Sequence, residues 1–155
     1  MKKIKRLLPS RKSLVSKCDA LFSLYIRLKS KRENNGACAF GCGRAECCFH
    51  FVSRAKHSLR WDEKNAVASC HGANYRYEFD PHFAIQWYIK KFGQKGYDDL
   101  IFRGNQQAKF SRSDLMDIRD SLNIKLVLVM DPVIGQWPGN GSGAREMGKA
   151  NGGQG

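Results

Sequence analysis

The sequence predicts an α+β fold, in which a mainly helical domain surrounds a small zinc-stabilised core of one hairpin and one helix. Apolar residues recur at three- and four-residue intervals over 13–31 and again over 111–126, which is typical of helices with one buried face. Between these segments, two short strand-like runs, 46–52 and 66–69, lie among cysteines at metal-ligand spacing. These observations together favour a mixed fold that a metal ion helps to hold together.

Composition indicates one domain with a polyanionic partner. The chain has 155 residues, of which 42% are hydrophobic, and this is enough for a single domain of ordinary size with a real core. The formal net charge is +13, and such an excess usually serves phosphate neutralisation and counterion release on nucleic acid. The alternatives are a charge that only improves solubility, or a protein that packs against RNA in a ribosome-like assembly.

The cysteines are interpreted through the compartment that the sequence indicates. No run of about 18 apolar residues is present, so we expect no transmembrane helix and no membrane partner. The basic start, Met1–Pro9, lacks the apolar core of a signal peptide. Without secretion, the six cysteines are better interpreted as thiols and metal ligands than as disulfides. Cys18 stands apart within the first helical pattern, and we expect it to be a small core residue.

The N-terminal region is expected to hold a basic arm, residues 1–12, followed by a helix. The helical pattern runs over 13–31 with Ser13 as its N-cap, and the polar run Glu33–Gly36 ends it. Up to the end of this pattern the chain is dense in lysine and arginine, and Asp19 is its only acid. Such density favours contact with a phosphate backbone over a merely solvated basic face.

A well-delimited helix is predicted after the second strand. Asp80 would cap it, Pro81 would take its first turn, and Gly93 follows its last turn. A short helix is expected next, over 96–103.

The last helix is predicted to begin at Ser111 or Ser113. Its final part, 124–130, could instead be a strand, because short β-branched apolar runs are ambiguous. From residue 132 onward Gly, Asn and Ser dominate and no periodicity remains, so we expect a disordered, Gly-rich tail over 132–155. The folded domain is therefore predicted to span 13–131.

Three cysteines have the spacing of a structural zinc site. Cys38 and Cys42 form one pair, with three residues between them instead of the commoner two, and Cys70 begins a second pair. The expected partner three positions on is Ala73, which cannot bind metal. The alternative is a set of reduced cysteines under a loop-rich core. If zinc is bound, the candidates for the fourth ligand are His71, Cys47 and Cys48.

A single histidine lies between the two cysteine groups, and two asparagines follow it. His50 ends the first predicted strand, Asn65 opens the second, and Asn74 comes just after the Cys70 group. One type of metal-dependent nuclease needs a neutral imidazole that deprotonates water, a side chain that fixes this imidazole, and a divalent cation held near the start of a helix. The order His–Asn–Asn fits this requirement. A histidine that only packs in the core would leave the asparagines unexplained.

The chain also carries short motifs in a fixed order, which together cover roughly residues 10–128. They are Asp19–Leu28, His50–Arg54, Arg60–Asn65, Cys70–Asn74, Tyr88–Gly93 and Phe110–Asp114. This pattern resembles the phage NinG/Rap family of recombination endonucleases, which are His-Me finger (HNH-like) proteins that act on branched DNA. The run His-Phe-Val-Ser-Arg is similar to the family's Gly-His-Phe-x-Ser-Arg.

The resemblance implies a treble-clef or ββα-metal core over 38–92 with structural Zn²⁺, and a nuclease centre that uses Mg²⁺ or Mn²⁺. By position, His50 would be the general base, Asn65 its orienting partner, and Asn74 a ligand of the catalytic metal. The implied substrates are Holliday junctions or other branched intermediates in the cytoplasm of a phage-infected bacterium. The symmetry of a junction would suit a homodimer.

Three positions differ from the family pattern. Phe49 stands where the family has glycine and many His-Me nucleases have a metal-binding aspartate, Cys47 where the family often has histidine, and Ala73 where it has a zinc cysteine. Phenylalanine offers no ligand, and thiolates prefer zinc to Mg²⁺. A catalytically inactive, zinc-stabilised protein that binds nucleic acid is therefore the main alternative. A protein that assembles with RNA or a nucleoprotein is a weaker one.

Recognition of a DNA branch depends on shape and phosphate contacts more than on base reading. Basic residues near the motifs, with the arm of residues 1–12, are therefore expected to bind branched or duplex DNA. The residues expected to contact the phosphate backbone are Arg27, Lys29, Lys31, Arg32, Arg54, Lys56 and Arg60.

Overall fold

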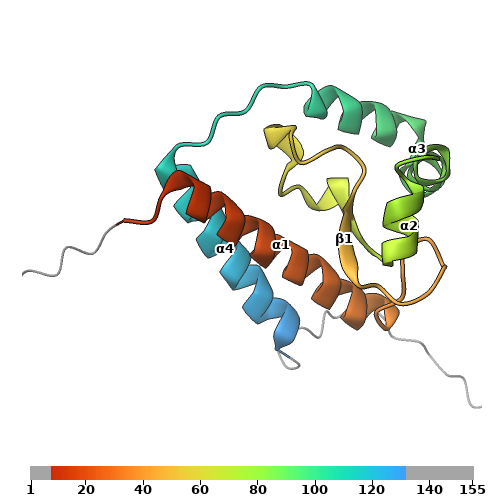
Figure 1. The fold of residues 1–155 in the computed structure, drawn as a ribbon, viewed down its shortest axis with the longest axis horizontal. Helices are drawn as coiled ribbons and strands as arrows, with labels where there is room; N and C mark the ends of the chain where they lie inside the picture. Colours follow the sequence, from red (N-terminus) through yellow and green to blue (C-terminus); the bar gives the residue numbers. More distant parts are fainter. Residues whose placement is uncertain (1–7, 132–155) are drawn as a thin grey trace, which may run out of the picture.

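The computed structural model describes residues 8–131, and its architecture is α+β and mostly helical, as predicted (Figure 1). The expected tail, 132–155, and residues 1–7 of the expected arm lie outside the described residues. Within 8–131, no helix has the length and hydropathy that crossing a bilayer requires. In chain order the elements are α1 (Arg11–Asn34), β1 (Cys47–His50), η1 (His57–Leu59), η2 (Glu63–Asn65), β2 (Ala66–Ser69), α2 (His71–Arg76), α3 (His82–Gly104) and α4 (Arg112–Met130).

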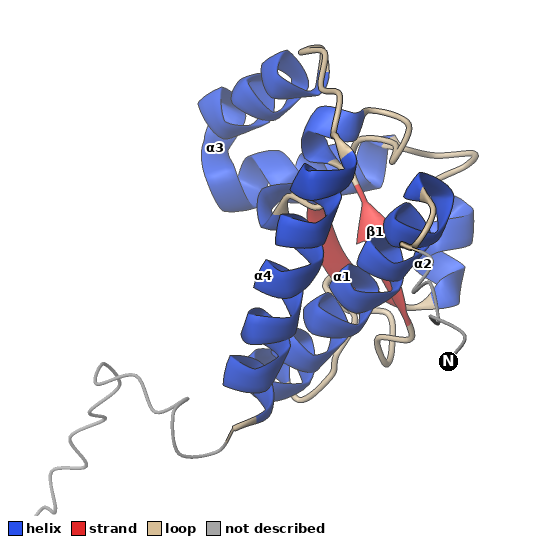
Figure 2. Cartoon of the chain, turned by 90° about the vertical axis from the view of Figure 1, so that its left-hand side faces the viewer, coloured by secondary structure: helices blue, strands red, loops and turns tan. Residues whose placement is uncertain are grey.

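The two helices α1 and α4 lie side by side and run in the same direction (Figures 1 and 2). Near their starts, the Sγ of Cys18 donates to the carbonyl of Leu115 over 3.4 Å. Near their ends, Arg32 donates to the carbonyl of Leu128 over 3.2 Å. Cys18 is fully buried, which confirms its expected place in the core. The apolar residues that this pair shares with β2 are Cys18, Phe22, Tyr25, Ile26, Ala66, Ala68, Leu122 and Leu126.

The ends of α1 and α4 follow from local capping. The N-cap of α1 is Ser10 and not Ser13, because the hydroxyl of Ser10 accepts from the backbone N–H of Ser13 three residues on. At the other end Asn35 adopts the left-handed conformation with φ 49°, which ends the helix at the predicted polar run. Of the two serines considered for the start of α4, Ser111 is the cap, and it forms a capping box with Asp114.

The ambiguous run 124–130 is helical, so the strand alternative is wrong. Leu122 and Leu126 of α4 are both buried against α1. Because these residues are spaced by one helical turn, packing on α1 favours the continued helix over a strand.

The two helices predicted on either side of Gly93, the second over 96–103, are both present, and they form α3 with a sharp bend between them. The bend lies at Gly93, whose φ of 77° and ψ of 164° are not helical and suit a residue without a Cβ. The helix starts one position later than predicted, with Pro81 and not Asp80 at the N-cap. The carboxylate of Asp80 accepts two hydrogen bonds from Arg76, at 3.1 and 2.7 Å.

The hairpin is confirmed as two antiparallel strands, β1 and β2, with His50 opposite Ala66. Successive side chains of a strand point to opposite faces. Phe49 therefore packs into a second, aromatic core that also contains Phe51 and Tyr88. His50 lies on the other face, with its ring centroid 5.9 Å from that of Phe22 in α1.

Two carboxylates attach the hairpin and its loop to the helix pair. Asp19 of α1 accepts from Arg60 at 2.9 and 2.7 Å and from the indole N–H of Trp61 at 2.9 Å. Glu63 lies between the two long helices, where it accepts from Lys29 of α1 at 2.9 Å and from Lys125 of α4 at 2.6 Å. Sequence-distant elements are thus joined by charged contacts at their edges as well as by apolar packing.

Glu63 should make folding stability depend on acidity. Burial raises the pKa of its carboxyl, but hydrogen bonds from Lys125, Lys29 and Tyr25 outweigh burial and lower it from 4.5 to about 2. The stabilisation is therefore complete above pH 4.5 and is lost as the pH falls towards 2. In Glu63→Gln we expect the free energy of unfolding at pH 7 to fall by on the order of 2 kcal/mol.

Chemical denaturation at pH 7, 4.5 and 2.5 would measure this effect. The difference between wild type and Glu63→Gln should shrink as the pH falls, whereas Glu78→Gln, an exposed glutamate, serves as the control. A difference that is the same at all three values would contradict this account.

Candidate functional site

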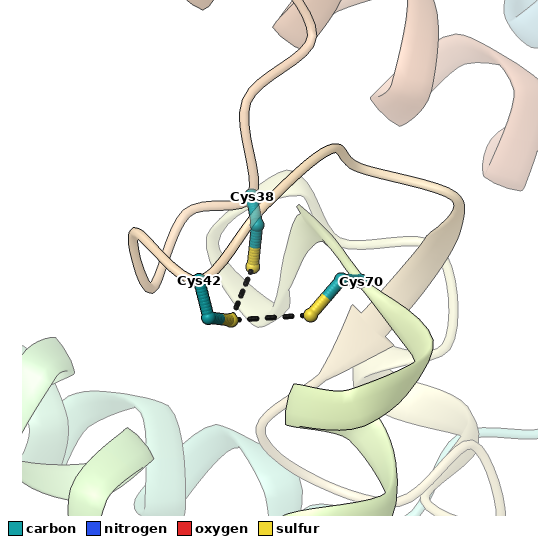
Figure 3. Close-up of side chains that lie close together, drawn as sticks. All are labelled: Cys38, Cys42 and Cys70. Atoms are coloured by element: carbon teal, nitrogen blue, oxygen red, sulfur yellow. Dashed lines mark hydrogen bonds between the residues drawn. The ribbon is translucent and has the colours of Figure 1, made fainter.

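Three cysteines come together at the base of the hairpin (Figure 3). The Sγ atoms of Cys38 and Cys42 are 3.4 Å apart, those of Cys42 and Cys70 are 3.1 Å apart, and all three lie within 4.8 Å of one another. Ligands about 2.3 Å from a tetrahedral zinc lie about 3.8 Å from each other, so this three-cysteine cluster has the dimensions of a zinc site. The predicted cluster of Cys38, Cys42 and Cys70 is confirmed as a possible metal site.

Local backbone geometry explains the cluster. The chain reverses between Cys38 and Cys42, with a hydrogen bond of 2.8 Å from the N–H of Cys38 to the carbonyl of Gly43. Gly41, at φ 75°, lies in this turn. Cys70 is the N-cap of α2, and its sulfur accepts from the N–H of Ala73 over 3.3 Å. The hydrogen bond from Cys42 and, next to it, this N–H lower the pKa of Cys70 and favour its thiolate, which is the metal-binding form.

The structure brings none of the three candidates for a fourth ligand into the cluster. Cys47 is held at Ser69, with its sulfur 3.3 Å from both the carbonyl and the hydroxyl oxygen. Cys48 lies on the face of β1 opposite to that of Cys47, against the α1–α4 core. The His71 side chain is exposed, and its backbone N–H points at Glu46. Within the described residues the cluster therefore has three protein ligands, so a fourth would come from solvent or from a rotated His71.

A pocket of about 340 Å³ lies on the other side of the hairpin. It is formed by α1, β1, the loop after β1 and α2, and we call it the histidine pocket. It unites the predicted residues His50 and Asn74, which are distant in the chain. Its lining residues are Asp19, Phe22, Ser23, Cys47, Cys48, His50, Ser53, Arg54 and Asn74.

The environment of His50 keeps its imidazole neutral. Burial lowers its pKa to about 4, the positive charge of Arg54 acts in the same direction, and a hydrogen bond with the backbone of Arg60 opposes both. Its Nε2 atom is buried and has no hydrogen-bond partner among the described residues. A buried polar atom without a partner is costly and usually indicates a missing ligand, ion or water. His50 is thus a neutral base with an unused hydrogen-bonding atom.

The sequence suggested that Asn65 orients the imidazole of His50, but the hydrogen bonds of the Asn65 side chain go to the backbone. Its side chain is fully buried, and it accepts from the N–H of Val52 at 2.7 Å and donates to the carbonyls of Val52 and Leu59 at 2.9 and 3.1 Å. The side-chain amide of asparagine both accepts and donates hydrogen bonds, so it can take the place of a backbone peptide group. Asn65 therefore fixes the loop that follows His50, so its role is to position the loop.

Asn74 lies on α2 and is exposed to the histidine pocket. Phe49, by contrast, is buried in the aromatic core, 4.9 Å from Tyr77 between ring centroids. The only carboxylate among the pocket's lining residues is that of Asp19, and Arg60 already binds it. Asp19 was not predicted to lie at the site, although its position as the only acid among the basic residues before Glu33 was a signal.

The basic residues predicted to bind DNA differ in their contacts and exposure. Lys29 and Arg60 form ion pairs with Glu63 and Asp19, so both contribute to the fold. Arg27 and Arg32 donate to backbone carbonyls of Ser23 and Leu128. Four of the seven side chains are exposed: Lys31, Arg32, Arg54 and Lys56. Of these, Arg54 lines the histidine pocket and is 60% exposed, 3.9 Å from Asp19.

Searches against family models, curated proteins and solved structures find no match for this chain. The resemblance to the NinG/Rap family stays a prediction from the motifs of the sequence. The three-cysteine cluster and the histidine pocket are therefore the features that indicate the chemistry of this chain.

We expect the purified protein to carry about one zinc ion per chain. Cys42→Ser and Cys70→Ser should each lose most of the metal and lower the melting temperature, because each removes a thiolate from the cluster. Cys47→Ser is the matched control and should keep the metal, since Cys47 lies outside the cluster. Elemental analysis and thermal unfolding measure both effects, and loss of zinc in Cys47→Ser but not in Cys42→Ser would contradict the ligand set.

The imidazole of His50 should titrate near pH 4, well below the usual value of 6.5. NMR titration of the histidine ring protons would measure this midpoint, and His50→Ala would assign the resonance. In Arg54→Ala the midpoint should rise, because a positive charge near the ring is removed. A midpoint near 6.5 in the wild type would show that the ring is solvated and the pocket open.

Proposed function

We propose that this protein is a metal-dependent endonuclease that nicks branched DNA, such as the four-way junctions of recombination, in a phage or prophage setting. The observation that carries the proposal is the shared pocket of His50 and Asn74, which come from β1 and from α2 after a two-stranded hairpin. This ββα arrangement with a thiolate cluster at its base is what a His-Me finger of the NinG/Rap type requires.

The electrostatics of the pocket support hydrolysis of a phosphodiester. A neutral imidazole can take a proton from water at pH 7, and burial keeps His50 neutral. Arg54 brings a positive charge to the same pocket, where it would attract a phosphate. The net charge of +13 adds long-range attraction for a DNA backbone.

A catalytic Mg²⁺ or Mn²⁺ would be held by the amide oxygen of Asn74, with phosphate oxygens and water as further ligands. This donor set suits Mg²⁺, which usually keeps several waters and takes few protein ligands. When bound, such a cation stabilises negative charge on the leaving oxygen. Within this scheme His50 accepts the proton of the attacking water, Asn65 holds the loop behind it, and Arg54 orients the phosphate.

Structural zinc at the three-cysteine cluster has a separate role in the proposal. Cys70 is the N-cap of α2, so a metal that joins it to Cys38 and Cys42 would fix this helix to the hairpin. Asn74 is four residues further along and would then face His50 in a constant geometry. Such a core would be a treble clef.

A second candidate function is binding of nucleic acid without cleavage. Phe49 favours it, because this side chain is buried in the aromatic core and leaves the position beside His50 without a carboxylate. Assembly with RNA has no observation of its own beyond the net charge.

Nicking of a four-way junction in the presence of Mg²⁺ or Mn²⁺ would test the proposal. His50→Ala should lower the cleavage rate by about 10²- to 10⁴-fold, which is typical for the loss of a general base, while junction affinity persists. His82→Ala is the control, because His82 is exposed on α3 away from the pocket. A folded wild-type protein that binds junctions but cleaves none with any divalent cation would favour the second candidate.

A further inference from the structure

A second pocket, of about 440 Å³, lies beside the first turns of α1 and next to η1. We call it the aromatic pocket. Its walls include Trp61 and Phe110, whose ring centroids are 5.5 Å apart with the rings tilted by 52°, and Val15 and Leu115 add apolar surface. The indole N–H of Trp61 donates to Asp19 at 2.9 Å, so this wall is held in place. Neither the three-cysteine cluster nor the histidine pocket accounts for this cavity.

The rim of the aromatic pocket is basic. Arg11 and Lys12 border it from the first turn of α1, and both are exposed. Arg60 also borders it, but its charge is balanced by Asp19. No acidic side chain lines this pocket in the described part of the chain. The positive charge at the rim therefore favours an anionic group, and the aromatic walls favour a flat apolar group of the same ligand.

We infer that the aromatic pocket binds one unpaired nucleotide of a DNA strand, with the base against Trp61 and Phe110 and the phosphate near Arg11 and Lys12. Aromatic side chains that flank unpaired bases, with cations on the backbone, are how proteins hold single-stranded nucleic acid. The volume is in the range of pockets that take ligands of nucleotide size. The inference rests on the proposed function, because it makes the strand at a DNA branch the ligand.

The two pockets lie along the same face of α1. Lys12 and Val15 line the aromatic pocket, and Asp19 and Phe22 line the histidine pocket. These positions follow one another at three- and four-residue intervals, which places them in one stripe of the helix. Lys12 and Phe22 are separated by about 15 Å at about 1.5 Å per residue. The facing edges of the two pockets, at Val15 and Asp19, are about 6 Å apart on the same basis. At about 3.4 Å per nucleotide along one strand, the held base would be about two to four nucleotides from the scissile phosphate.

Fluorescence of 2-aminopurine in a four-way junction can test this inference independently of cleavage. The probe would replace one base at a time, at successive positions from the branch, and the protein would carry His50→Ala so that the DNA stays intact. We expect a change in fluorescence at one position, about two to four nucleotides from the candidate cleavage site, because the base leaves its stacking neighbours in the DNA and packs on an aromatic ring instead. Phe110→Leu in the same background keeps an apolar wall but removes the ring, so it should abolish this change and weaken binding about tenfold.

Two further variants make the result specific. Phe102→Leu is the matched control, because Phe102 is 66% exposed on α3 and lies outside the aromatic pocket; it should keep the change. Lys12→Ala should retain the folded walls and lower the salt dependence of binding by about one phosphate contact.

An equal signal at every position, no signal in a bound complex, or a signal that Phe110→Leu leaves intact would overturn the inference. So would a failure to bind DNA, which would also remove the proposed function. A position-specific signal from a protein whose wild type never cleaves would overturn only the nuclease.

Discussion

The carboxylate of Asp19 is the contact on which both pockets depend. It binds the guanidinium of Arg60 at two oxygens and the indole of Trp61, residues more than forty positions away on the loop after β1. Burial raises the pKa of Asp19, but the hydrogen bond and charge of Arg60 outweigh burial and lower it. Both partners are only 19% exposed, and a half-buried cation without its partner costs several kcal/mol. Asp19 thus fixes the wall between the histidine pocket and the aromatic pocket.

The hairpin itself needs support from outside. Its two strands have four residues each, and a two-stranded sheet of this size is marginal alone. Support comes from the α1–α4 pair on one face, the aromatic core on the other, and the three-cysteine cluster at the base. This arrangement explains why a small domain can hold a histidine at a strand end in a constant position.

Neighbouring residues on β1 have opposite tasks because a strand alternates its faces. Phe49 gives the aromatic core a fully buried ring, and His50 turns to the histidine pocket. A carboxylate in place of Phe49 would be buried among aromatic rings in this geometry, at a high desolvation cost. In the proposed nuclease, a cation in the histidine pocket would gain no ligand from position 49, so Asn74 of α2 would remain as its ligand candidate.

The sequence alone determined the features that depend on local pattern: most of the helical segments apart from 124–130, the strand 66–69 with its partner strand, the buried Cys18, and the cluster of Cys38, Cys42 and Cys70. Periodicity, turn residues and short spacings are visible without knowledge of the fold. Only the tertiary structure decided which polar side chains are already engaged. Arg60 and Lys29 look like free cations in the sequence, yet each meets a carboxylate far away in the chain. The partners of Asn65 and the exclusion of Cys47 from the cluster were likewise decided by packing, because a spacing along the chain does not specify which face of a strand or which distant helix a side chain meets.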